Sequence, residues 1–352
     1  MNRPFSPSVA LPQVDRAAGE LRRGGMVALS RNGQTVALVL ACEYLSDDAV
    51  AAMPEPQLAM SARRAEALGL GGEIALMAPA GPADAARFAR LADPLDDKAT
   101  LDGWRSLPVP DWAEAAVALA KLAGLLPMVL VAACDAAPDG LLEVATEAVL
   151  AFPSVAARSL RRVAEADLPL AACEQCHVIA FRPADGGSEH LALIIGKPDL
   201  RQPVLTRLHS ACFTGDLLGS LRCDCGEQLQ GAIARLAQEG GGVLLYLAQE
   251  GRGIGLVNKL RAYQLQDGGL DTLDANRHLG FEDDERLYLQ AVQMLTALEI
   301  SQVRLLTNNP HKVEALVRHG ITVTERVPHV FPANPHNRRY LRTKAERSGH
   351  LF

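Results

Sequence analysis

The stretch that decides the fold of the second half of the chain is residues 203–247, PVLTRLHSACFTGDLLGSLRCDCGEQLQGAIARLAQEGGGVLLYL. Its two ends, Pro203–His209 and Val243–Leu247, are short apolar runs of the kind that form buried strands. Between them, Gly226–Glu239 has apolar residues at helical spacing and is followed by glycines, which is typical of a helix that ends at glycine. A strand, a helix and a second strand in this order predict an α/β domain.

The residues after 247 continue the alternation of helices and strands. The pattern predicts helices over Leu256–Gln266 and Asp284–Leu298, a strand over Val303–Leu306, and a helix that Asn309 caps, Pro310 begins and Gly320 ends. In α/β sheets, functional loops tend to follow the carboxyl ends of strands. Glu250, Asn308 and Asn309 occupy such loops, which makes them candidates for ligand contacts.

The residues before 160 also read as mixed α/β. The helices expected there are Val14–Arg23, Pro82–Leu91 and Trp112–Leu122, and the strands are Met26–Leu29, Thr35–Cys42 and Met128–Ala132. Ala92–Pro110, with several Pro, Asp and Gly residues, reads as a long loop. A chain of 352 residues favours two domains. We expect two mixed α/β domains, one over residues 1–160 and one over residues 161–352.

The composition is that of an ordinary globular protein, with 49% hydrophobic and 22% charged residues. A formal net charge of −6 argues against a general nucleic-acid binder, because such proteins neutralise phosphates with Lys and Arg. No apolar run approaches the roughly 20 residues that span a membrane, and the amino terminus lacks the apolar core of a secretory signal. We therefore expect a cytoplasmic protein with no membrane and no nucleic-acid partner.

Three of the seven cysteines form a candidate metal site. Cys212, Cys223 and Cys225, at C-x10-C-x-C spacing, can converge on one zinc ion if the chain folds back between the first and the pair. Three thiolates match an open catalytic site with water in the fourth position, whereas His209 as a fourth ligand would give a closed, structural site. The alternative of three unrelated thiols is disfavoured, because Arg, Asp and Gly around the pair are too polar for plain core.

The other four cysteines carry weaker signals. Cys42 and Cys134 stand alone in apolar surroundings and read as ordinary buried thiols. Cys173, Cys176 and His177 spell the attachment pattern of c-type haem, but such attachment normally follows export, which nothing here directs. An accessory metal site fits this segment better than haem attachment, but we expect neither function there and place the segment in a strand or a turn.

The run of residues 209–229, HSACFTGDLLGSLRCDCGEQL, resembles the zinc-binding signature of GTP cyclohydrolase II. The resemblance continues in order through residues 249–255 (QEGRGIG), 258–263 (NKLRAY), 279–281 (LGF), 284–286 (DER) and 307–310 (TNNP), and covers nearly all of residues 161–352. Several long motifs together are far more specific than any one alone. The resemblance implies the GTP cyclohydrolase II fold and hydrolysis of GTP to 2,5-diamino-6-(5-phospho-ribosylamino)pyrimidin-4(3H)-one, formate and diphosphate, the first step of riboflavin biosynthesis.

In that reaction water attacks C8 of guanine, and zinc lowers the pKa of a bound water to roughly 7. The resemblance implies that the three clustered cysteines hold one zinc per subunit, that Asp284 accepts a proton and that Tyr263 helps to remove formate. Arg286 matches the family's proposed nucleophile toward the α-phosphate, although an electrostatic clamp suits a guanidinium better because its pKa lies above about 12. Release of diphosphate implies Mg²⁺ with the triphosphate, held mostly by phosphates and water.

The resemblance also implies a set of GTP contacts and a homodimer. The positions that match the family's substrate contacts are Arg207, Leu208, His209, Ser210, Ala211, Gln228, Glu250, Gly251, Arg252, Thr272, Thr307 and Lys312. Arg207, Arg252 and Lys312 are the expected phosphate ligands, because each lies by a strand end or a glycine turn. Lys312 also occupies the first turn of a helix, whose N–H groups favour an anion. Glu250 could accept hydrogen bonds from guanine N1 and N2.

Two positions depart from the family pattern. Ala211 stands where many members carry Glu, and His311 replaces a common Lys. One rival interpretation is therefore a related enzyme that stops at a formamidopyrimidine or uses another nucleotide. A second is a non-catalytic zinc module that binds protein or RNA, as the basic tail Asn337–Arg347 might suggest on charge alone; alternating Arg, Lys and Glu there are more typical of an exposed helix.

The first domain is similar to 3,4-dihydroxy-2-butanone 4-phosphate synthase, which is often fused in front of this enzyme. The likeness rests on Leu21–Leu29 and Thr35–Met53. That synthase needs an acidic, metal-binding loop between the two strands, whereas the loop here, Ser30–Gln34, contains no carboxylate. We therefore expect a degenerate, non-catalytic domain that serves folding or dimer contacts.

Overall fold

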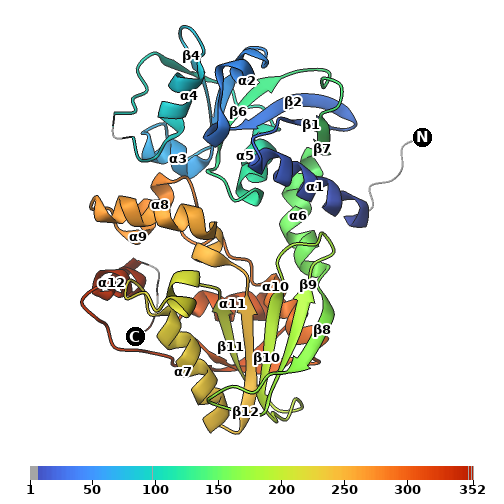
Figure 1. Ribbon diagram of the computed structural model, residues 1–352, viewed down its shortest axis with the longest axis vertical. Coiled ribbons are helices and arrows are strands. Elements are labelled where there is room, and N and C mark those ends of the chain that lie inside the picture. The colour runs from blue at the N-terminus through green and yellow to red at the C-terminus, as the bar shows by residue number, and fades with distance from the viewer. Residues whose placement is uncertain (1–6, 97, 348, 350, 352) are drawn as a thin grey trace. The chain divides into compact units, whose positions relative to one another are not determined.

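The computed structural model describes residues 7–96, 98–347, 349 and 351 (Figure 1). The chain divides into two compact units that are interleaved along the sequence. The first unit runs to Pro153 and also contains Val257–Glu285, and the second comprises Ser154–Leu256 and the chain from Arg286 onward. The domains expected from the sequence are continuous, over residues 1–160 and 161–352, whereas Val257–Glu285 packs with the first unit.

The described part of the first unit is built on one mixed sheet of seven strands, in the order β5-β4-β3-β6-β2-β1-β7. The strands are β1 (Val27–Arg31), β2 (Gln34–Ala41), β3 (Gln57–Met60), β4 (Ala75–Pro79), β5 (Trp104–Leu107), β6 (Met128–Ala133) and β7 (Leu142–Ala145). Neighbours are antiparallel except β1 and β7, which are parallel. The loop predicted over Ala92–Pro110 is wrong at Trp104–Leu107, because backbone pairing with β4 makes these residues a strand.

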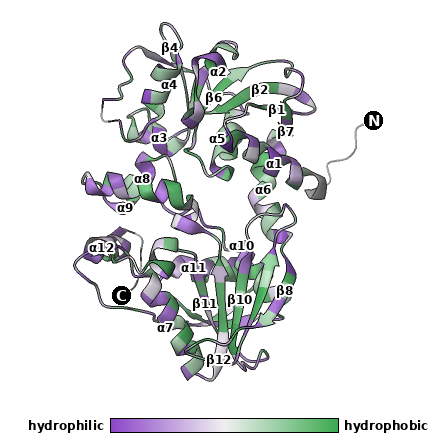
Figure 2. Cartoon of the chain, viewed as in Figure 1, coloured by the Kyte–Doolittle hydropathy of each residue, from purple (hydrophilic) through white to green (hydrophobic). Residues whose placement is uncertain are grey.

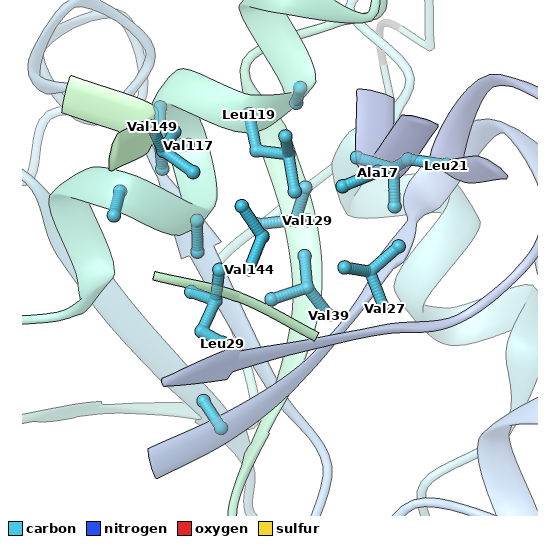
Figure 3. Close-up of a cluster of buried hydrophobic side chains, with 14 of the residues drawn as sticks. Ala17, Leu21, Val27, Leu29, Val39, Val117, Leu119, Val129, Val144 and Val149 are labelled. Atoms are coloured by element: carbon cyan, nitrogen blue, oxygen red, sulfur yellow. The ribbon is translucent and has the colours of Figure 1, made fainter. Parts of the chain in front are cut away.

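Helices cover both faces of this sheet. They are α1 (Pro7–Arg22), η1 (Cys42–Tyr44), α2 (Asp47–Ala51), α3 (Ala62–Ala67), α4 (Ala85–Ala92), α5 (Ala113–Leu122) and α6 (Thr146–Arg158), with α8 (Gly255–Asp267) and α9 (Thr272–His278) farther along the chain. Alternate strand residues point to opposite faces. Leu29, Val39 and Val129 are buried with residues of α1 and α5 (Figure 3), whereas Leu38 and Leu130 are buried with α2, α3 and α4.

The connection between β1 and β2 is a two-residue hairpin turn. Asn32 and Gly33 have positive φ angles of 52° and 78°, and Arg31 pairs with Gln34 across the turn. Positive φ at both central residues is typical of a type I′ turn, whose twist matches that of the flanking strands. The segment Ser30–Gln34 is therefore a tight turn without a carboxylate and offers no acidic loop between the two strands.

The described part of the second unit also has one mixed sheet of seven strands, in the order β14-β13-β11-β12-β10-β9-β8. The strands are β8 (Arg161–Asp167), β9 (Cys176–Arg182), β10 (His190–Gly196), β11 (Val204–Ser210), β12 (Gly241–Leu247), β13 (Gln302–Leu306) and β14 (Thr322–Val327). The pairs among β14, β13, β11 and β12 are parallel, and the remaining pairs are antiparallel. Two mixed α/β units confirm the predicted fold class.

Helices cover both faces of the second sheet as well. They are η2 (Phe213–Leu217), α7 (Cys225–Gln238), η3 (Glu250–Gly253), α10 (Leu289–Ala297), α11 (Pro310–Arg318) and α12 (Arg338–Arg347). α10 and α11 are buried against one face, with Val243 and Leu245, and α7 against the other, with Leu244. Figure 2 shows the apolar character of β10 and the hydrophilic character of α12. None of the helices in the described ranges is both long and apolar enough to span a bilayer.

The helix predictions after residue 280 are partly right. The Asn309 side chain accepts a hydrogen bond from the His311 N–H at 3.0 Å, and Pro310 begins α11, which confirms the predicted cap. The helix predicted from Asp284 begins only at Leu289. Residues 284–288 are not helical, because the Glu285 side chain accepts a hydrogen bond from the backbone N–H of residue 282 at 2.8 Å and so closes a turn instead.

The cysteines outside the cluster take ordinary positions. Cys42 is buried, as predicted, whereas Cys134 is half-buried. Cys173 lies in a turn closed by a bridge to Leu170, and Cys176 begins β9, so this segment is the strand and turn that the sequence predicts.

Candidate metal centre and nucleotide site

Three adjacent parallel strands bring many predicted site residues to one edge of the second sheet. β11 lies between β12 and β13, with Ser210 opposite Leu247 and Thr206 opposite Leu305. The loops after these parallel strands therefore leave the sheet at the same edge. The predicted residues carried there are Arg207, Leu208, His209, Ser210, Ala211, Cys212, Cys223, Cys225, Gln228, Glu250, Gly251, Arg252, Thr307 and Lys312.

Cys212, Cys223 and Cys225 converge, and their sulfur atoms all lie within 4.8 Å of one another. The Cys212 and Cys223 sulfurs are 3.8 Å apart. Two sulfurs bonded to one zinc at about 2.3 Å, with tetrahedral angles, lie about 3.8 Å apart, so the spacing fits this ion. The hydrogen bond with Cys212 raises the pKa of the Cys223 thiol to about 11, and Cys212 and Cys223 raise the pKa of Cys225. A bound cation would favour all three thiolates.

The chain reaches this arrangement by folding back through η2. Cys212 follows β11, and Cys225 is the first residue of α7, where the helix N-terminus favours a thiolate. A Cβ atom on Gly215 would lie 2.8 Å from the Cys223 sulfur and 3.1 Å from that of Cys212, and one on Gly226 would lie 2.5 Å from the Gly215 oxygen. Both positions therefore need glycine, because the backbone at Gly215 packs against the sulfur atoms and the backbone at Gly226 packs against that of Gly215.

Asp216 fixes the loop that carries the first cysteine. Its carboxylate accepts hydrogen bonds from the Cys212 N–H at 2.9 Å and the Tyr246 hydroxyl at 3.0 Å, and it lies 3.1 Å from His209 Nε2. His209 also stacks on Tyr246, with ring centroids 5.6 Å apart. The ligand cluster of the described residues contains the three cysteines and not His209. This arrangement favours the open site over the closed alternative, because Asp216 already engages His209.

A chain of buried and half-buried polar groups adjoins the cysteine cluster. The Arg207 guanidinium donates to the Leu306 carbonyl at 2.9 Å and to the Gln228 side chain, which in turn donates to Asp224. Lys344 pairs with Asp224 at 2.9 Å. Burial lowers the pKa of Arg207 to about 10. Burial alone would raise the pKa of Asp224, but Lys344 lowers it below its ordinary value.

The position of Lys344 shows that the basic tail, which we expected to be an exposed helix, is partly buried. The predicted helix is present as α12, but it is not exposed on all sides. Leu341, Thr343 and Lys344 are buried. The helix presents this face because an uncompensated buried carboxylate at Asp224 would be costly, and the Lys344 ammonium offsets that cost.

The turn after β12 is conformationally strained and attached to the cysteine loop. Gly251 and Arg252 have φ angles of 64° and 63°, a region that costs a non-glycine residue on the order of 1 kcal/mol. The Glu250 carboxylate accepts hydrogen bonds from the Phe213 N–H at 2.6 Å and the Gly251 N–H at 2.9 Å. Phe213 follows Cys212 directly, so the Glu250 side chain links this turn to the cysteine cluster.

Two basic side chains meet around Tyr288. The Arg286 guanidinium lies 5.6 Å and the Lys312 ammonium 5.9 Å from the centre of the Tyr288 ring. The Arg286 guanidinium also donates to the Ser210 hydroxyl at 3.4 Å, and the Lys312 ammonium donates to the Leu208 carbonyl at 2.7 Å. Two cations held at the carboxyl edge of parallel strands suit a phosphorylated ligand.

Three predicted site residues belong to the first unit. Tyr263 lies on α8, where the Lys259 ammonium is 5.8 Å from its ring centre, and Thr272 is the first residue of α9. Asp284 lies in the turn after α9. Arg286, only two residues later, belongs to the second unit. The structure therefore divides the predicted site residues between the two units.

Sequence reasoning misses several residues that shape the site. They are Gly215, Asp216, Asp224, Tyr246 and Lys344. Three of them lie inside the quoted cysteine motif, where a T-G-D run after the first cysteine and a carboxylate between the second and third are visible signals. Lys344 gives no local signal, because its partner Asp224 is 120 positions away.

Comparisons with known proteins identify the family. The family model for GTP cyclohydrolase II matches residues 161–328. The chain is 52% identical over 366 residues to a GTP cyclohydrolase-2 of Azospirillum brasilense, with 97% of this chain and 94% of that protein covered. It is also 52% identical over 193 residues to a GTP cyclohydrolase-2 of Escherichia coli (strain K12 / DH10B), covering 55% of this chain and 98% of that protein.

A solved structure is similar over most of the chain but superposes poorly. It is RibBX, a two domain 3,4-dihydroxy-2-butanone 4-phosphate synthase from A. baumannii, with 17% sequence identity and a TM-score of 0.33, covering 90% of this chain and 99% of that chain. Because one relative matches this chain almost from end to end, the chain belongs to the GTP cyclohydrolase II family of enzymes.

Proposed function

We propose that this chain hydrolyses GTP to 2,5-diamino-6-(5-phospho-ribosylamino)pyrimidin-4(3H)-one, formate and diphosphate, as the first step of riboflavin biosynthesis. Membership of the GTP cyclohydrolase II family supports this activity. The observation that carries it is the cluster of three cysteine sulfurs within 4.8 Å, beside two cations at the carboxyl edge of the sheet. Three thiolate ligands match a catalytic zinc site, which leaves one position for water.

Zinc bound by Cys212, Cys223 and Cys225 would supply a water acidic enough to attack C8 of guanine near neutral pH. Asp216 holds the first cysteine's backbone, and Gly215 provides the space that the sulfurs need. Neither residue has to contact the substrate to act in this way.

The remaining groups have proposed roles toward GTP itself. Arg286 and Lys312 bind the phosphates, and Arg286 acts as an electrostatic clamp because a guanidinium stays protonated. Asp284 accepts a proton, and Tyr263 assists the removal of formate. Arg207 is a further proposed nucleotide contact, and its buried Nε has no hydrogen-bond partner among the described residues. Mg²⁺ accompanies the triphosphate, bound mainly by phosphate and water oxygens.

We also propose a homodimer in the cytoplasm that takes GTP as its small-molecule substrate and binds neither nucleic acid nor membrane. The first unit is proposed to lack 3,4-dihydroxy-2-butanone 4-phosphate synthase activity. The tight turn Asn32-Gly33 supports this, because it places no carboxylate where a metal-binding loop would be needed. Formation of the butanone phosphate from ribulose 5-phosphate would contradict this part of the proposal.

The test is a mass-resolved product assay of zinc-loaded protein with GTP and Mg²⁺, beside a Cys223→Ser variant. Formate, diphosphate and the diaminopyrimidine monophosphate are expected from the wild type, and all three should be lost in the variant. A formylated product would instead indicate an enzyme that stops at the formamidopyrimidine, the alternative that Ala211 favours. Intact GTP with one zinc per chain would refute the cyclohydrolase proposal and leave other nucleotides or a binding role.

A further inference from the structure

The segment that returns to the first unit carries residues with proposed catalytic roles. Val257–Glu285 contains Tyr263, Thr272 and Asp284, yet it packs with residues before Pro153. We infer that the first unit is a scaffold that positions the turn carrying Asp284, and that Lys121 is a positioning residue for it. The inference rests on the proposed function, because that function gives Asp284 its role.

The carboxyl end of α9 is bound by the N-cap and the first turn of α3. The Ser61 hydroxyl donates to the Gly280 carbonyl at 2.6 Å, and the Arg64 guanidinium donates to the His278 carbonyl at 2.9 Å. Arg64 also donates to the Leu91 carbonyl at the end of α4, and only 2% of it is exposed. The donors of a guanidinium lie in one plane, so Arg64 can reach the carbonyl ends of both helices only at one spacing between them. This buried side chain therefore fixes that spacing.

Gly280 lets the backbone approach closely at this point. Its φ angle is +94°, and a Cβ atom there would lie 2.7 Å from Pro127 and 2.8 Å from the Ser61 hydroxyl oxygen. Phe281, the next residue, is buried with 2% of its surface exposed. The packing of Gly280 against Pro127 and Ser61, together with the burial of Phe281, therefore fixes the backbone that leads into the turn around Asp284.

The acidic residues around Asp284 are each paired with a cation of the same unit. Glu282 pairs with Arg63 at 2.8 Å, and Asp283 pairs with Arg277 at 2.8 Å. These pairs offset the repulsion among neighbouring carboxylates, so the turn can hold four acidic residues in four consecutive positions.

Lys121, at the end of α5, closes the turn. Its ammonium lies 2.6 Å from a Glu285 carboxylate oxygen, and the same oxygen accepts the N–H of Glu282 at 2.8 Å. Asp284 lies between those two residues, so the two contacts of the Glu285 carboxylate restrict the backbone that carries Asp284. The pair is partly exposed, at 27% and 21% of the side chains. Pairs of this kind contribute little to stability, so removing Lys121 should disturb the turn and leave the unit folded.

The other end of the segment is held in the same way. The Arg261 guanidinium pairs with Glu43 at 2.9 Å, and the Asn258 side chain donates to the Gly124 carbonyl at 3.1 Å. Both residues lie on α8, which carries Tyr263. Residues of the chain before Pro153 therefore contact the returning segment before Tyr263 and on both sides of Asp284.

The test compares Lys121→Met, Lys121→Arg and a matched control, Arg31→Met, in the full-length, zinc-loaded protein. Arg31 forms an ion pair with Asp111 at 2.5 Å in the same unit and lies at the end of β1, beside the Asn32-Gly33 turn. Lys121→Met should lower kcat by about 10- to 100-fold, because small displacements of a reacting group cost that much. KM should stay within about twofold of the wild-type value. Lys121→Arg should restore most of the loss, and Arg31→Met should match the wild type.

Hydrogen exchange of the peptide covering residues 279–286 separates this inference from the proposed function. The peptide should lose protection in Lys121→Met and keep it in Lys121→Arg, whatever reaction the protein catalyses. Unchanged protection, or unchanged kcat, in Lys121→Met would overturn the inference. An inactive wild type would refute the proposed function alone, and the exchange data would still decide whether Lys121 orders the turn.

Discussion

Substituting Gly215 with alanine tests the metal centre through a residue that is not itself a ligand. The new Cβ atom would lie 2.8 Å from the Cys223 sulfur, whereas ordinary contacts are 3.4–4 Å. The sulfur or the loop must therefore move by about 0.6 Å, more than the roughly 0.2 Å within which metal–ligand distances vary. Disturbing a residue that supports metal ligands typically weakens metal affinity by about 10- to 100-fold, or about 1.4 to 2.8 kcal/mol.

The assay is a competition for zinc between the protein and a chromophoric chelator, with thermal unfolding measured in parallel. The backbone of Gly215 does not have a positive φ, so alanine introduces only the steric conflict. Gly72→Ala is the matched control, because Gly72 also lacks a positive φ and a Cβ atom there meets nothing within 4 Å. Wild-type zinc affinity in Gly215→Ala would refute the argument that the cysteine sulfurs pack against this glycine around a metal.

Three further outcomes are expected. Asp216→Ala should lower the free energy of unfolding by about 2–4 kcal/mol, because the half-buried Tyr246 hydroxyl and the Cys212 N–H both lose their acceptor; an unchanged denaturation midpoint would contradict this. Lys344→Met should cost about 3–5 kcal/mol by leaving Asp224 buried and unpaired, and adding Asp224→Asn should recover much of that loss in the same denaturation experiment. Burial lowers the pKa of His190 to about 4. The unfolded chain binds this proton near pH 6.5 and the folded chain does not, so the free energy of unfolding should fall by up to about 3 kcal/mol as the pH falls from 6.5 to 4. His190→Gln should make the free energy of unfolding less dependent on pH over this range.

Local patterns predict much of the second unit correctly. The strand, helix and strand expected within residues 203–247 are β11, α7 and β12, and the Asn309 cap begins α11. These elements depend on apolar periodicity, glycine stops and caps, which neighbouring residues specify. The helix prediction from Asp284 is wrong over its first turn, because a residue distant in the sequence determines the conformation there. There the Glu285 carboxylate meets Lys121 from α5, 164 positions away, and a turn replaces the helix.

The sequence by itself determined the family and the three cysteines that converge in the candidate metal site. Their spacing is short, so the loop between a strand and the following helix is enough to bring them together. Only the tertiary structure decided that Asp216 engages His209, that Lys344 neutralises Asp224 and that Val257–Glu285 packs with the first unit. Each of the last two depends on contacts between residues more than 100 positions apart, and the first depends on the fold of a loop around a buried carboxylate. Such contacts follow from how whole elements pack, which no local pattern encodes.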